Sequence, residues 1–92
     1  MGMVKKHFLI YGRVQGVGFR YFTWKQANAL ALCGMVRNRK DGSVEVIAIG
    51  EDTQIDALYH WLQQGPKTAD VKQVIMQDYV GQAVFDDFSV QR

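Results

Sequence analysis

The residues from Gly12 to Arg20 combine glycines with an arginine in the run Gly12-Arg13-Val14-Gln15-Gly16-Val17-Gly18-Phe19-Arg20. A glycine turn that leads into a helix gathers unpaired backbone N–H groups, and the helix dipole adds attraction for negative charge. Arg20 would add a planar set of donors that matches two phosphate oxygens. A cation at a helix N-terminus opposes the dipole, which favours a binding role for Arg20. The alternative is that the glycines only allow a turn and that Arg20 is solvated.

Other phosphate-binding motifs do not fit this run. A Walker A loop needs Gly-Lys followed by Ser or Thr, but Phe19 follows Gly18, and the dinucleotide fingerprint needs a third glycine where Tyr21 stands. A phosphatase loop of the Cys-x5-Arg kind needs a cysteine where Val14 stands. No thiolate nucleophile is therefore expected beside Arg20.

The remaining ionisable residues give no metal motif. The two histidines, His7 and His60, are isolated in the sequence, and we expect both at the surface, away from the loop. Acidic residues at 52, 56, 86 and 87 have no metal-ligand spacing with either histidine, and the single cysteine is Cys33. We expect no metal, no other cofactor and no intramolecular disulfide.

Alternating strands and helices must position the glycine run. Three kinds of pattern predict the elements in the first half of the chain: period-two alternation rich in strand formers, near-helical spacing of apolar residues, and the Asp41-Gly42 turn signal. The sequence predicts a strand from His7 to Val14, a loop from Gln15 to Gly18, a helix from Arg20 to about Leu32, and strands from Met35 to Asn38 and from Ser43 to Ile49.

The second half repeats the pattern. A helix is predicted from Glu51 and Asp52 until Gly65-Pro66, because apolar residues recur there at helical spacing. Strands are predicted from Val71 to Tyr79 and from Phe85 to Val90. The order βαββαβ predicts an α+β, ferredoxin-like sandwich, with both helices on one face of an antiparallel sheet and room for an extra C-terminal strand.

Length and composition set further bounds. The chain has 92 residues, of which 48% are hydrophobic, enough for one core, so we expect a single domain spanning residues 1–92. The formal charge of +2 gives little support to nucleic-acid binding. No run of residues is long and apolar enough for a membrane span or a signal peptide. We expect a cytoplasmic monomer, although the segment from Phe85 to Val90 could pair as an edge strand.

Two long blocks resemble the acylphosphatase family. Gly12 to Arg20 is similar to the family signature, and Gly34 to Glu45 is similar to its second block. Further similarity follows at Gly65-Pro66, Ala69, Val71 and Val74, so the resemblance covers essentially the whole chain.

The resemblance implies hydrolysis of the carboxyl-phosphate anhydride bond of a small acyl phosphate. It implies that Arg20 grips the phosphate and that Asn38 holds the attacking water, with no covalent intermediate. A carboxylate leaving group is weakly basic, so a dedicated general acid is not required. By the same resemblance, the phosphate cradle comes from the backbone of Gln15, Gly16, Val17, Gly18, Phe19 and Arg20.

Two other functions stay open at this stage. An RNA-binding module of the same fold carries its aromatic signature on the third strand, whereas the similar residues here, Gly16 to Phe22, enter a helix. The other is a non-catalytic anion sensor or a regulatory domain of acylphosphatase type. The basic residues Arg37, Arg39 and Lys40 either steer an anionic substrate or form a solvated turn.

Overall fold

The computed structural model describes residues 2–92. Within this range two helices and five strands follow one another in the predicted order, with a short extra strand at the end. The elements are β1 (Val4–Arg13), α1 (Phe19–Ala29), β2 (Cys33–Asn38), β3 (Val44–Gly50), α2 (Asp52–Gln64), β4 (Asp70–Asp78) and β5 (Phe88–Val90).

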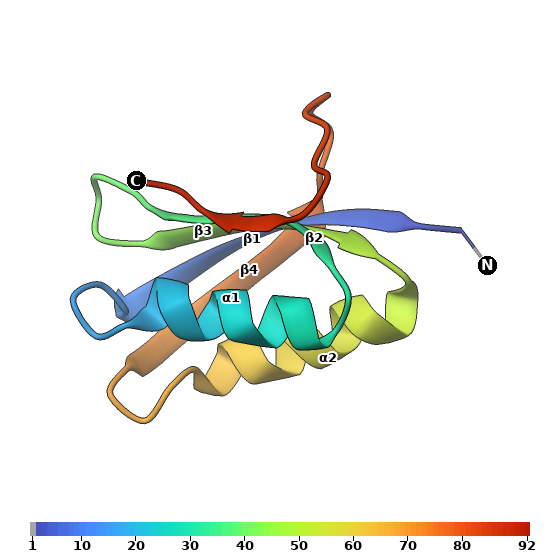
Figure 1. Cartoon of the computed structure of the whole chain (residues 1–92). Helices are drawn as coiled ribbons and strands as arrows, with labels where there is room; N and C mark the ends of the chain where they lie inside the picture. The colour runs from blue at the N-terminus through green and yellow to red at the C-terminus, as the bar shows by residue number, and fades with distance from the viewer. Residues whose placement is uncertain (1) are drawn as a thin grey trace.

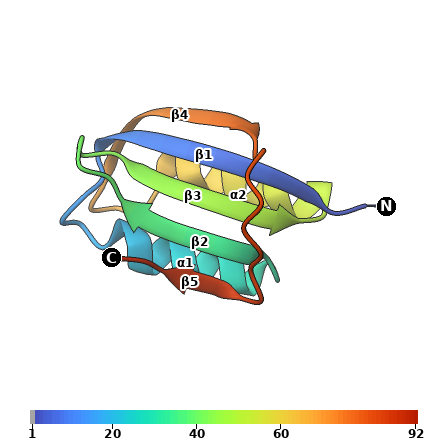
Figure 2. The same ribbon diagram turned by 90° about the horizontal axis from the view of Figure 1, so that it is seen from above.

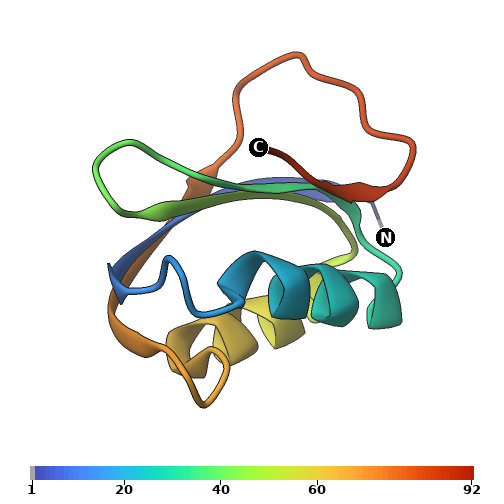
Figure 3. The same ribbon diagram turned by 60° about the vertical axis from the view of Figure 1, so that its left-hand side comes forward.

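The strands form one sheet in the order β4-β1-β3-β2-β5. Strand β1 pairs antiparallel with β3 and β4, and β2 pairs antiparallel with β3, as the βαββαβ prediction requires. Strand β5 pairs parallel with β2, so the complete sheet is mixed. Between β4 and β5 the chain crosses the face of the sheet opposite the helices (Figures 2 and 3). This crossover carries the C-terminal segment from one edge of the sheet to the other.

Both helices cover the same face of the sheet, as predicted (Figure 1). Phe8 and Ile10 alternate with more exposed neighbours along β1 and are fully buried against this layer. Phe19 begins α1 and packs against Trp61 of α2, with ring centroids 5.8 Å apart. The core also includes buried residues of the other elements, namely Ala27, Leu32, Val36, Val44, Val46, Ala48, Ile55, Leu58, Leu62 and Phe88.

Helix α1 ends three residues earlier than predicted. Ala31 adopts a left-handed conformation with φ 58°. The N–H of Leu32 then donates to the carbonyl of Ala27 (2.9 Å) and that of Ala31 to Asn28 (3.1 Å), which together form a Schellman cap. The turn places Leu32 in the core, where its side chain is only 3% exposed. Burial of Leu32 therefore outweighs the helical propensity of Leu30 and Ala31.

Candidate active site

The glycine run connects β1 to α1 in a tight loop. Gly16 and Gly18 have φ angles of 74° and 80°, which side chains with a Cβ rarely adopt. Gly18 is the N-cap of α1 and supplies no side-chain oxygen to the first turn. Its carbonyl accepts the N–H of Phe22 at 3.1 Å, while helix geometry leaves the preceding first-turn N–H groups without partners inside the helix. These donors are therefore free for an anion.

At the start of helix α2, by contrast, side chains satisfy the first-turn N–H groups. The side chain of Glu51 accepts from the backbone of Gln54, and Gln54 accepts the N–H of Glu51 at 3.0 Å, completing a capping box. Asp52 adds a negative charge to the first turn of α2, whereas the first turn of α1 has no acidic residue. The N-terminus of α1 thus keeps its positive potential.

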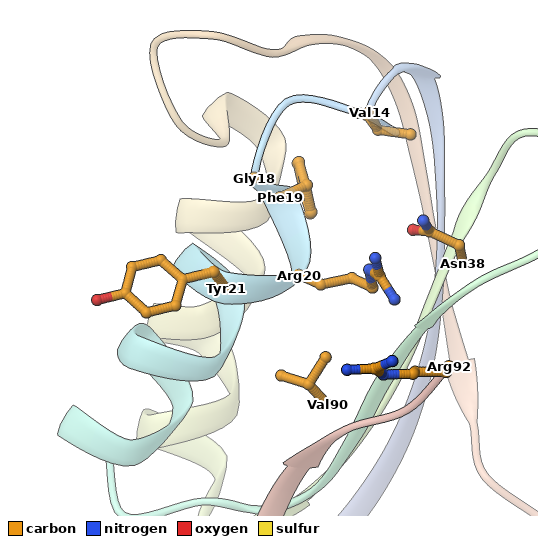
Figure 4. Close-up of a pocket in the computed structure, with 9 residues that line it drawn as sticks. Val14, Gly18, Phe19, Arg20, Tyr21, Asn38, Val90 and Arg92 are labelled. Carbon is orange, nitrogen blue, oxygen red and sulfur yellow. The ribbon is translucent and has the colours of Figure 1, made fainter.

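A cleft of about 700 Å³ opens beside this loop. Arg20 comes from α1 and Asn38 from the end of β2, and both side chains point into the cleft (Figure 4). The structure therefore brings the two predicted catalytic side chains together, although they lie 18 positions apart in the sequence. The residues that line the cleft are Val14, Gly16, Gly18, Phe19, Arg20, Tyr21, Asn38, Val90 and Arg92.

Gln15 and Val17, which were predicted to contribute backbone donors, do not line the cleft. The side-chain amide of Gln15 instead donates to the carbonyls of Arg39 and Ser43, both at 2.8 Å. The carbonyl of Val17 accepts the hydroxyl of Thr68 at 2.6 Å. These contacts anchor the loop, and the contribution of the two backbone N–H groups to the cradle stays a prediction.

Arg20 is held in place by the C-terminal segment. Its Nη1 atom donates to the backbone carbonyl of Gln91 at 3.2 Å. The N–H of Gln91 in turn donates to the carbonyl of Val36 at 2.8 Å, which ties the segment to β2. This arrangement leaves the other guanidinium N–H groups of Arg20 able to donate to a bound anion.

Asn38 presents an unsatisfied acceptor. Its Oδ1 atom is buried and accepts no hydrogen bond from the residues that the structure describes. An unpaired buried acceptor costs about 1–3 kcal/mol, and an O–H donor at this place would remove the cost. A water molecule is such a donor, which suits a role in positioning one.

The turn that follows Asn38 is internally bonded. The N–H of Arg39 donates to the carbonyl of Ser43 at 2.8 Å. Asp41 accepts both the hydroxyl (2.6 Å) and the N–H (2.9 Å) of Ser43, and these hydrogen bonds lower the pKa of the Asp41 carboxyl. Since Gln15 also bonds to this turn, the loop and the strand that carries Asn38 form one hydrogen-bonded unit.

The basic residues around Asn38 do not line the cleft. Arg37 forms an ion pair with Glu45, and Arg39 approaches Asp41 at 3.6 Å. Glu45 also contacts Nε2 of His7 at 2.6 Å. These contacts favour a structural role for Arg37 and Arg39 over substrate steering.

The expectation for the histidines was half right. His60 is exposed, as predicted. His7 is half-buried between Glu45 and Gln77, whose side-chain nitrogen lies 2.9 Å from Nδ1, so its predicted surface position was wrong. His7 is not among the residues that line the cleft.

Four cleft residues were not predicted as site residues from the sequence: Val14, Tyr21, Val90 and Arg92. Tyr21 follows Arg20 directly, so its place could have been inferred from the helix start. Arg92 and Val90 reach the cleft only because β5 pairs parallel with β2. No local sequence pattern predicts that pairing.

Metal binding and membrane insertion are two other possible kinds of site. Within residues 2–92, no group of three or more His, Cys, Asp and Glu side chains is placed to hold a metal ion. Neither of the helices in this range is long and apolar enough to cross a membrane.

The fold is that of an α+β protein of ferredoxin-like topology, with a cleft beside the loop between β1 and α1. The Acylphosphatase family model matches residues 6–90. The chain is 60% identical over 89 residues to an acylphosphatase of Pasteurella multocida, covering 97% of this chain and 99% of the relative. It is 50% identical to one of Actinobacillus succinogenes, covering 98% of this chain and all of the relative.

A solved structure gives the same result. An acylphosphatase from Coxiella burnetii superimposes with a TM-score of 0.89 at 38% identity, covering 97% of this chain and 93% of the other. The chain therefore belongs to the acylphosphatase family.

Proposed function

We propose that this protein hydrolyses acyl phosphates to a carboxylate and inorganic phosphate through direct attack of water on phosphorus. The observation that carries the proposal is the convergence of Arg20 and Asn38 in one cleft beside the uncapped N-terminus of α1. Family membership supports the same activity, because the similar curated proteins are named acylphosphatases.

The phosphate binds first in this mechanism. Its oxygens accept hydrogen bonds from first-turn N–H groups of α1, from the glycine loop and from the guanidinium of Arg20. These donors neutralise the equatorial oxygens, whose charge phosphoryl transfer must stabilise. The Gln91 carbonyl keeps Arg20 oriented, so little reorganisation is needed when charge develops.

Asn38 then positions the nucleophile. A water that donates to Oδ1 of Asn38 would lie across the cleft from the leaving group, with a lone pair directed at phosphorus. The bond from this water to phosphorus forms as the bond from phosphorus to the acyl oxygen breaks. The electron pair of the broken bond leaves with the carboxylate, and the water proton passes to the phosphate product or to solvent.

The cleft has no carboxyl, imidazole, ammonium or thiol group for general acid catalysis. None of its lining residues in the described part of the chain is Asp, Glu, His, Lys or Cys, and the phenol of Tyr21 points away from Arg20 and Asn38 (Figure 4). This composition suits a leaving group that departs without protonation, and a carboxylate is such a group. An alkyl phosphate ester, whose alkoxide is strongly basic, would be a poor substrate.

Hydrolysis of benzoyl phosphate tests the proposal. Purified protein is compared with Arg20→Gln and Asn38→Ala, with folding verified by circular dichroism. Each substitution is expected to lower kcat by roughly 10²–10³-fold, the usual cost of one such donor or positioning group. Inorganic phosphate should inhibit competitively, and a chelator should have no effect.

Asn28→Ala and Lys5→Gln are matched controls outside the cleft. Asn28 is exposed on α1, where its amide donates to the carbonyl of Trp24, and Lys5 is exposed on β1. Both should keep full activity. A folded wild-type protein without turnover would refute the enzyme and leave an anion-binding module.

We further propose that the protein acts as a single domain and a monomer in the cytoplasm, without nucleic acid. The mixed surface charge and the absence of a second cysteine in the sequence support this setting. Light scattering after size exclusion tests whether the protein is a monomer. A binding assay with RNA at low salt tests whether it binds nucleic acid. A concentration-independent dimer or salt-dependent RNA affinity would contradict this proposal.

A further inference from the structure

The cleft contains a second guanidinium that the mechanism does not use. Arg92 follows β5, and its side chain points into the same cleft as Arg20 (Figure 4). Among the residues that the structure describes, neither arginine forms an ion pair with an acid. Two cations in one cleft repel each other unless anions lie between or beside them.

The two arginines reach the cleft from different elements, Arg20 from α1 and Arg92 from the segment after β5. Arg20 is fixed to the Gln91 carbonyl and belongs to the α1 end of the phosphate loop. In Figure 4, Arg92 lies on the opposite side of Arg20 from Gly18 and Val14. A phosphate held by the loop would therefore contact Arg20. Arg92 would face the part of the substrate that extends away from the loop.

An apolar side chain lies beside the second arginine. Val90 lines the cleft two residues before Arg92 and lies next to it in Figure 4, whereas the ring of Tyr21 points away from both guanidinium groups. Val90 offers an apolar surface for the carbon skeleton of an acyl group. The cleft thus combines the N-terminus of α1 and Arg20 with an apolar side chain and a second cation.

We propose that Arg92 is a specificity-determining residue that favours acyl phosphates whose acyl group carries a second anionic group. This inference rests on the proposed function, since it assigns the acyl side of the same cleft. The guanidinium of Arg92 donates hydrogen bonds to a carboxylate or phosphate at the far end of the acyl group. It takes no part in the transfer of the reacting phosphate.

A matched pair of substrates separates the two roles. Benzoyl phosphate and 4-carboxybenzoyl phosphate share the same reacting group and ring, and the para carboxylate cannot reach its own carbonyl. The selectivity is the ratio of kcat/KM for the carboxylated substrate to that for the plain one. It is measured for the wild type, Arg92→Gln, Arg92→Lys and the charge-matched control Lys5→Gln.

Arg92→Gln is expected to lower this selectivity roughly fivefold to tenfold, the range for a partly exposed charge-assisted hydrogen bond. The kcat/KM for benzoyl phosphate should change less than twofold. Arg92→Lys should retain part of the selectivity, and Lys5→Gln should retain all of it. Equal losses for both substrates would place Arg92 on the transferred phosphate and overturn the proposal, as would an unchanged selectivity.

Binding measured without turnover shows whether the subsite proposal fails independently of the proposed hydrolytic function. Calorimetry compares benzylphosphonate with 4-carboxybenzylphosphonate on the wild type and on Arg92→Gln. A preference for the carboxylated ligand that Arg92→Gln removes supports the subsite even if no acyl phosphate is hydrolysed. Equal affinities on the wild type refute the subsite, whatever the catalytic result.

Discussion

The amide of Gln15 links the glycine loop to the turn that follows Asn38, and Gln15→Met tests this link. Methionine keeps the length and much of the volume of the side chain but removes both N–H donors. Two hydrogen bonds of 2.8 Å, to the carbonyls of Arg39 and Ser43, are lost. At about 1 kcal/mol for each bond, the substitution should lower the free energy of unfolding by about 2 kcal/mol. For a domain of this size the Tm should fall by roughly 10 °C.

Catalysis should fall further than stability alone explains. Without the amide, the loop and the turn after Asn38 are no longer held in one geometry, and a displacement of about 1 Å can cost as much as 10²-fold in rate. We expect kcat for benzoyl phosphate to fall by roughly 10- to 100-fold at 25 °C, where the variant is still folded. Urea unfolding and initial-rate kinetics on the same preparation provide both numbers.

A double-mutant cycle identifies the cause. If Gln15 acts by fixing Asn38 relative to the loop, Gln15→Met should cost much less activity in an Asn38→Ala background. Gln63→Met, at an exposed position of α2, controls for the substitution itself. Full activity in a destabilised Gln15→Met protein would refute the positioning argument, and unchanged stability would show that the two hydrogen bonds contribute nothing.

Three further changes have expected outcomes. Thr23→Val should raise the Tm by roughly 4–8 °C in a calorimetric scan, because it removes a fully buried hydroxyl without a partner among the described residues; a lower Tm would contradict this. Ala31→Gly should stabilise the protein by about 0.5–1 kcal/mol in urea, because glycine adopts φ 58° without strain, and destabilisation would show that the Schellman turn prefers alanine. Burial raises the pKa of Glu45, but hydrogen bonds from His7 and Arg37 lower it more, so the net pKa lies below its usual 4.5. Glu45 therefore contributes stability above about pH 4.5 that is lost as the pH falls further, and Glu45→Gln should flatten the acid limb of a stability curve, whereas an unchanged limb would contradict the coupling.

Local patterns predicted the elements because each is amphipathic toward one core. The alternation around Phe8 and Ile10 and the helical spacing of Ile55, Leu58 and Leu62 all match residues that the structure buries. The resemblance of the two sequence blocks directed attention to Arg20 and Asn38, whose proximity no local pattern could give.

Long-range pairing accounts for what the sequence did not predict. The early end of α1 depends on the burial of Leu32, and the parallel pairing of β5 depends on a crossover over the sheet. Arg92 enters the cleft as a result of that pairing. Its position is a property of the folded sheet and not of the residues next to it in the sequence.

The hydrogen bond from Arg20 to Gln91 joins positions 71 apart. Closing so long a segment costs conformational entropy, and this cost comes before the contact itself contributes any stabilisation. Such contacts therefore tend to form late in folding. A refolding molecule can therefore assemble the loop, both helices and the central strands while Arg20 still lacks its carbonyl partner. Recovery of hydrolysis would then lag behind recovery of the fluorescence of the two tryptophans, and enzyme activity would report when β5 docks.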